Sequence, residues 1–134
     1  QHMKHTTTVS LTVRAMMPGD GTTVELRLGE GRAAHRFVAD QEQHELKITQ
    51  DLEEGRHTLF LHFKTAPGSR AALQIIGMRI QGVPLFTSLY QGAFHARSNP
   101  LNAVEGTLDM NEPGTWRIAV STPAHINYWG VGFA

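Results

Sequence analysis

Hydrophobic and polar residues alternate along most of the chain with a period of two. Apolar residues occupy every second position over residues 9–15, and they do so again over 24–28 and 59–63. Successive side chains of a β-strand point to opposite faces of the sheet, so each of these segments is expected to form a strand with one buried face. Residues 17–21 and 29–31 are rich in glycine and separate neighbouring segments, which is typical of turns.

Further segments have the same extended character, and none has a sustained amphipathic helical period. They are residues 32–39 (more polar, expected near a sheet edge), a short strand around Leu46 and Ile48, and residues 57–64, 73–80, 106–110, 116–121 and 126–133. About eight or nine short strands separated by turns are typical of a two-sheet sandwich. The pattern predicts an all-β, single-domain β-sandwich or jelly roll of antiparallel strands. It is expected to span residues 4–134, because residues 1–3 read as a cloning remnant.

The apolar phase slips within the segment 73–80. Leu73 and Ile75 share one face of the expected strand, whereas the apolar residues from Ile76 onward fall on the other. Either a β-bulge near Ile75 and Ile76 or a strand buried on both sides would account for the slip. Gly77 suits a bulge, because glycine in a strand interior often marks one.

Residues 81–105 differ in composition from the alternating segments. They combine turn residues with several large apolar and aromatic side chains. We expect a long, ordered connection that contains a short strand or a helical turn. Loops of this length in compact domains are often functional.

Composition narrows the function classes. Lys+Arg and Asp+Glu number 12 each, so the basic excess that is typical of nucleic-acid binders is missing and no nucleic-acid partner is expected. The chain has no cysteine, which excludes disulfides, thiolate metal sites and a cysteine nucleophile. No apolar run approaches the length that crosses a bilayer, so no membrane partner is expected either.

Two stretches resemble a known family. Residues 9–31 (VSLTVRAMMPGDGTTVELRLGEG) place a strand ending in Arg-Ala before a glycine-rich turn and a Val-Glu-Leu strand. This run resembles the opening hairpin of calcium-dependent, xylan-type carbohydrate-binding modules. Residues 73–82 (LQIIGMRIQG) are similar to a later strand of that family. The resemblance covers roughly the first 80 residues, and it implies a β-sandwich that binds polysaccharide.

The sequence departs from this family at the calcium-binding loop. The corresponding loop reads Thr65-Ala-Pro-Gly-Ser-Arg70 and contains no carboxylate. Calcium takes about six to eight oxygen ligands, usually with several carboxylates among them, and Asp20 and Glu25 alone do not supply these. We therefore expect no calcium and no other cofactor.

The aromatic residues are the best candidates for binding. Sugar rings stack their C–H faces on tryptophan and tyrosine, while amides and carboxylates bind the hydroxyl groups. If 126–133 is a strand, Tyr128 and Trp129 point to opposite faces, so one of them lies outside the core. The alternative is that Trp116 and one of this adjacent pair are core residues and the long connection covers the other. The candidate ligand-binding residues are Trp129, Tyr128, Trp116, Tyr90, Phe94 and Asn127.

Histidines and carboxylates show no diagnostic spacing. The chain has 8 histidines, but His57 and His62 are five positions apart and therefore face opposite ways in a strand. Asp51, Glu53 and Glu54 are typical of a turn, and no Gly-x-Ser-x-Gly elbow is present. The sequence predicts no metal site, no catalytic residues and no enzymatic activity.

Two functions fit these observations. The first is a non-catalytic module, like a carbohydrate-binding module, that recognises a polysaccharide or glycan through exposed aromatic side chains. The second is a structural β-sandwich, such as a phage virion, capsid-decorating or tail-associated subunit, in which sheet edges or aromatic surfaces mediate assembly. A homo-oligomer stays open in both cases, as does the location, which is extracellular for the first and the virion for the second.

Overall fold

The computed structural model describes residues 3–17, 19–37 and 42–129, with the side chains of residues 35–37 and 129 outside the description. The first half of the chain forms β1 (Lys4–Met17), β2 (Thr23–Leu28), β3 (Ala34–Phe37), β4 (Gln43–Glu53), β5 (Gly55–Lys64) and β6 (Ala72–Ile80). The second half forms β7 (Val83–Leu85), the 3₁₀ helix η1 (Ser88–Gln91), β8 (Ala93–Ala96), β9 (Ala103–Glu105), β10 (Asp109–Met110), β11 (Gly114–Thr122) and the short helix α1 (Ile126–Trp129).

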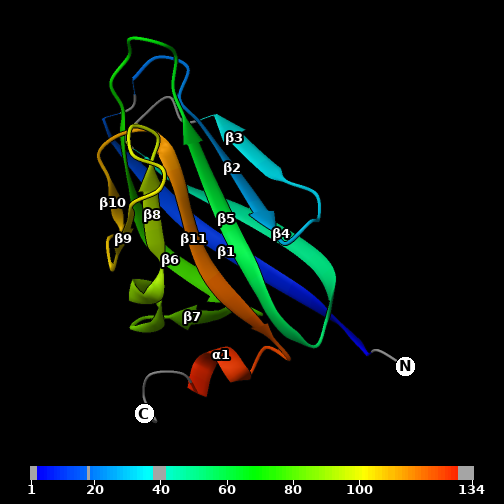
Figure 1. The fold of residues 1–134 in the computed structure, drawn as a ribbon. Helices are drawn as coiled ribbons and strands as arrows, with labels where there is room; N and C mark the ends of the chain where they lie inside the picture. The colour runs from blue at the N-terminus through cyan, green and yellow to red at the C-terminus, as the bar shows by residue number, and fades with distance from the viewer. Residues whose placement is uncertain (1–2, 18, 38–41, 130–134) are drawn as a thin grey trace.

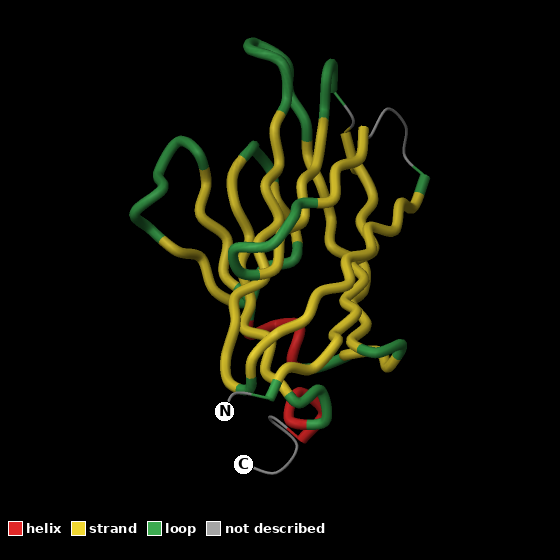
Figure 2. The backbone as a smooth tube through the Cα atoms, turned by 90° about the vertical axis from the view of Figure 1, so that its right-hand side faces the viewer, coloured by secondary structure: helices red, strands yellow, loops and turns green. Residues whose placement is uncertain are grey.

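The strands form two antiparallel sheets that pack face to face (Figures 1 and 2). One sheet has the order β10-β6-β1-β4, with β7 paired to β6, and the other has the order β3-β2-β5-β11-β8-β9. The predicted β-sandwich is therefore confirmed. The polar strand β3 lies at the edge of its sheet, as its composition predicted.

The core consists of the alternating apolar positions found in the sequence. Val9, Leu11 and Val13 of β1 face Leu59 and Leu61 of β5 across the sandwich interior, and all five are buried. Burial of apolar side chains from both inner faces is what holds two stacked sheets together. The intervening polar residues of β1 and β5 face outward.

The phase slip in β6 is a β-bulge. Thr12 of β1 pairs with Gly77 and the next residue, Val13, pairs with Ile75, so Ile76 has no partner in the register. The bulge returns Met78 to the core, whereas Ile76 points outward with 37% of its surface exposed. A strand buried on both sides is thus excluded.

The predicted strand 126–133 is wrong over residues 126–129, and residues 130–133 lie outside the described part of the chain. The backbone N–H groups of Ile126, Asn127 and Tyr128 donate to carbonyls three residues earlier, which winds this segment into a helical turn. The Asn127 side chain reinforces the turn, because its amide donates to the backbone oxygens of Ser121 and Ala124. The resulting helix α1 lies across one end of the sandwich (Figure 1).

The connection 81–105 is more regular than the sequence predicted. It contributes β7 and β9 and the 3₁₀ helix η1, and it places β8 beside β11. No helix in the described ranges is long and apolar enough to cross a membrane.

Candidate functional site

Trp116 and Phe94 belong to the core, which corrects the expectation that their rings are available to a ligand. The two residues are paired across β11 and β8, and their side chains are 0% and 6% exposed. The strand β11 lies inside its sheet, between β5 and β8. The side chain of Trp116 points into the core between the two sheets. The indole Nε1 of Trp116 is buried without a hydrogen-bond partner among the described residues.

Asn127 and Tyr128 tie α1 to the end of the sandwich. The Asn127 side chain accepts the backbone N–H of Ser121 at 2.8 Å and donates to the backbone oxygen of the same residue at 2.8 Å. The Tyr128 hydroxyl donates to the carbonyl oxygen of Ile80 at 2.5 Å, and burial raises the pKa of this phenol. The polar groups of both residues are thus engaged within the chain. The side chain of Trp129 lies outside the description.

Tyr90 is the candidate whose ring faces solvent, with 59% of its surface exposed. It sits in η1, where its backbone N–H donates to the carbonyl of Thr87 at 3.1 Å. The preceding residue, Leu89, is buried in the core and anchors the helical turn. Burial of Leu89 therefore holds the adjacent Tyr90 on the outside.

Tyr90 lines a cleft of about 490 Å³ to which all four strands of the β10-β6-β1-β4 sheet contribute residues. This volume is within the range of small-molecule sites, which is about 300–1,000 Å³. We call it the Tyr90 cleft and define it by Arg14, Gln74, Ile76, Tyr90, Thr107 and Asp109.

The bulge in β6 builds one wall of the Tyr90 cleft. Ile75 precedes the bulged residue Ile76, and its backbone N–H donates to the carbonyl of Leu108 at 2.8 Å. This bond holds the loop after β9 along β6. The N–H of Gly106 donates to the carbonyl of Gly92 at 3.1 Å, which fixes the same loop to the end of η1.

Hydrogen bonds within the chain hold polar groups of the Tyr90 cleft in place. Arg14 donates a guanidinium N–H to Oε1 of Gln74 at 2.9 Å across the β1–β6 pair. Thr107 receives the backbone N–H of Asp109 at 3.3 Å and donates to its carbonyl at 3.0 Å, so the turn before β10 is fixed. An exposed aromatic ring beside planar donors and a carboxylate is suited to a ligand that has a flat apolar face and many hydroxyl groups.

The sequence-based candidates missed Arg14, Gln74 and Asp109. Arg14 and Gln74 are polar residues at outward positions of their strands. Every solvent-exposed strand face has polar residues at such positions, so the pattern did not distinguish these two. The signal for this location was the phase slip beside them, because β-bulges are enriched next to functional sites.

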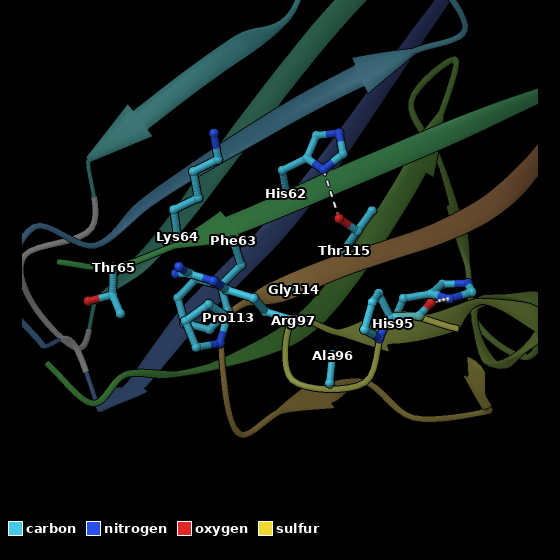
Figure 3. A pocket seen from close by; sticks show the side chains of 11 residues that line it. His62, Phe63, Lys64, Thr65, His95, Ala96, Arg97, Pro113, Gly114 and Thr115 are labelled. Atoms are coloured by element: carbon cyan, nitrogen blue, oxygen red, sulfur yellow. Dashed lines mark hydrogen bonds between the residues drawn. The ribbon is translucent and has the colours of Figure 1, made fainter. Parts of the chain in front are cut away.

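A second cleft, of about 580 Å³, lies at the end of β5 where β11 begins (Figure 3). We call it the basic cleft and define it by His62, Lys64, His95, Arg97, Pro113 and Thr115. It opens on the other sheet of the sandwich, so the two clefts share no residue.

Hydrogen bonds fix the histidines of the basic cleft. His62 Nδ1 and the Thr115 hydroxyl are 2.9 Å apart across β5 and β11 (Figure 3). His95 Nδ1 is 2.9 Å from the carbonyl oxygen of Pro100, and Arg117 donates its Nε–H to His95 Nε2 at 2.9 Å. A carbonyl only accepts and an arginine only donates, so in these bonds His95 donates through Nδ1 and accepts at Nε2.

Burial is the main cause that lowers the pKa of His62 below 6.5. The positive charges of Arg27 and Lys64 lower it further, and the carboxylate of Glu25 opposes the shift. The ring of His62 also stacks on Phe60, with centroids 6.0 Å apart and the planes 6° from parallel. Burial and the two positive charges favour the neutral imidazole.

The donor groups present do not fit a calcium site. The loop 65–70 supplies no carboxylate, and it contacts Asp20 through backbone and hydroxyl groups, with the Asp20 carbonyl accepting from the N–H of Ala66 at 2.9 Å. Among the described residues, no three His, Asp or Glu side chains gather closely enough to hold a metal ion.

Two solved structures have this architecture. One is the selenomethionine form of vCBM60, described as part of an evolutionary link by circular permutation between two families of calcium-dependent carbohydrate-binding modules. It matches with a TM-score of 0.57 and 10% sequence identity over 83% of this chain and 88% of that chain. The other is vCBM60 in complex with galactobiose, with a TM-score of 0.54 and 10% identity over 82% of this chain and 95% of that chain.

The fold is a β-sandwich like that of vCBM60. The resemblance seen in the sequence is confirmed at this level, and the likeness at 10% identity is one of architecture. No model of a known protein family matches the sequence, and no curated protein matches it.

Proposed function

We propose that this chain is a non-catalytic module that binds a polysaccharide or glycan, with the Tyr90 cleft as its binding site. The observation that carries the proposal is the exposed Tyr90 ring beside Arg14, Gln74 and Asp109 on the fold of a carbohydrate-binding module. In this proposal the tyrosine ring stacks on one sugar face, and the polar side chains bind its hydroxyl groups.

The composition of the cleft supports binding over hydrolysis. Asp109 is the one carboxylate among the described residues that line the Tyr90 cleft. Glycoside hydrolysis ordinarily uses a pair of carboxyl groups on either side of the scissile bond. The structural neighbours, too, are described as binding modules.

Calorimetric titration against a panel of plant and bacterial polysaccharides, including galactan and xylan, tests the proposal. We expect at least one neutral polysaccharide to bind, and Tyr90→Ala to weaken that binding by about tenfold or more, since the stacking surface is lost. Tyr90→Phe keeps the ring and should retain most of the affinity.

Phe86→Ala is the matched control. Phe86 is exposed over 77% of its surface and lies just before η1, but it does not line the Tyr90 cleft. Equal losses of affinity in Tyr90→Ala and Phe86→Ala would show that the binding site is not the Tyr90 cleft. Absence of binding to every polysaccharide of the panel would refute the proposed function.

The two similar solved structures give no support to the assembly alternative. Light scattering addresses it independently of any ligand. A stable trimer or larger ring would favour assembly, whereas a monomer favours a recognition module.

A further inference from the structure

The basic cleft is lined by positively charged side chains and, among its described residues, by no carboxylate. Lys64 and Arg97 line it from β5 and from the loop between β8 and β9, and both side chains are exposed. Neither residue forms an ion pair within the described ranges. The described residues that line the cleft include no Asp or Glu.

The carboxylates near the basic cleft are engaged elsewhere. Glu25 lies beside His62 in the register of β2 and β5, but its carboxylate accepts from Arg27 at 2.8 Å. Glu112 precedes β11, and its carboxylate accepts the backbone N–H of Ser98 at 3.2 Å. Both carboxylates lie outside the lining of the cleft, where Lys64 and Arg97 are the charged side chains.

The remainder of the cleft offers apolar surface and fixed polar groups. Pro100 and Pro113 contribute ring surfaces, whereas the side chain of Phe63 is buried in the core. The backbone N–H of Arg97 donates to the carbonyl of Pro113 at 2.9 Å, which joins the two loops that form the walls. The His62–Thr115 contact across β5 and β11 keeps the floor rigid.

We propose that the basic cleft is a second binding site, which takes a sugar unit bearing an acidic group, either a carboxylate or a sulfate ester. Lys64 and Arg97 bind the anion, and the rings of Pro100 and Pro113 contact the apolar part of the sugar. That the anion is carried by a saccharide rests on the proposed function, whereas the preference for an anion rests on the cleft alone.

Titration of trigalacturonate and of the neutral trisaccharide with the same linkage tests the carboxylate. The two probes differ only in a carboxylate or a hydroxymethyl group at C6, so any difference in affinity reports the charge. Cellotriose and cellotriose sulfate form the corresponding pair for the sulfate ester. We expect the acidic member of at least one pair to bind more tightly, with an affinity that falls as salt is raised.

The double variant Lys64→Gln/Arg97→Gln should weaken binding of the acidic probe by about tenfold, since two screened charge contacts are lost. Lys47→Gln removes an exposed lysine from β4 on the opposite sheet and should leave the affinity unchanged. The charged residues are exposed, so both variants are expected to fold, which an unchanged melting temperature would verify.

Tyr90→Ala separates the two proposals. Binding of the acidic probe should persist in Tyr90→Ala, and binding of a neutral polysaccharide should persist in the Lys64/Arg97 variant. Equal affinity for both members of each pair, or a double variant that binds like the parent protein, would overturn the basic cleft without touching the Tyr90 cleft. Equal binding of inorganic sulfate or of a single-stranded oligonucleotide would overturn the assignment to a sugar.

Discussion

The indole ring of Trp116 packs directly against the α-carbon of Gly92. A Cβ added at Gly92 would lie 2.5 Å from Cε2 and Cζ2 of the ring. Both residues are buried, and Phe94, two residues after Gly92, pairs with Trp116 across the sheet. This contact requires glycine at the junction of η1 and β8, and it places that junction, with Tyr90 beside it, against the core.

Gly92→Ala should therefore destabilise the protein. The added methyl group meets a ring that has no room to move, and overpacking of this kind costs about 1–3 kcal/mol. Urea unfolding followed by circular dichroism measures the change in the free energy of unfolding. Gly77→Ala is the control, because a Cβ there meets nothing within 4 Å and should shift the free energy by less than about 0.5 kcal/mol. Equal effects of the two substitutions would contradict the packing described for Trp116.

Asn127→Ala should lower stability and leave ligand affinity intact. The substitution removes three hydrogen bonds to the backbone of Ser121 and Ala124 and leaves polar groups of the turn unpaired, which costs about 1–3 kcal/mol. Thermal unfolding and titration of the same variant separate the two properties. Asn102→Ala changes an exposed asparagine and should affect neither. A loss of affinity in Asn127→Ala without a loss of stability would return Asn127 to the binding site.

His62 should make the protein less stable as the pH falls. Burial lowers the pKa of His62 in the folded state below its unfolded value of 6.5, so the unfolded chain binds the proton more readily. The stabilisation is complete above pH 6.5 and is lost as the pH falls through the folded-state pKa. Unfolding in urea at several values between about pH 7 and pH 5 measures this slope. His62→Gln should reduce the pH dependence of the free energy of unfolding, whereas His57→Gln, on the same strand, should not. An unchanged pH dependence in His62→Gln would show that it does not arise from His62.

Much of the fold could be predicted from local pattern. The inward positions of β1, β2 and β5 follow from the alternation of apolar and polar residues alone, because every second residue of a strand lies on the same face. The bulge was visible as a slip of phase between Ile75 and Ile76, since a one-residue shift exchanges the faces of a strand.

The error at residues 126–129 has a physical cause. An alternating segment becomes a strand only when a neighbouring strand is available to accept its hydrogen bonds. The chain after Thr122 instead finds partners within itself, through Asn127 and the carbonyls of residues 123–125. The alternation of Ile126 and Tyr128 was therefore not sufficient to predict its conformation.

The sequence by itself determined the all-β class, the two-layer core and the near absence of helix, because side-chain burial with period two is a local property of the chain. Only the tertiary structure decided which aromatic rings are free. The pairing of β11 between β5 and β8 buries Trp116, whereas the burial of Leu89 leaves Tyr90 outside. It also brought Arg14, Gln74 and Asp109 together, and Lys64 and Arg97 together, from strands and loops far apart in the chain. Such groupings depend on strand order, and strand order is set by long-range pairing that no local pattern encodes.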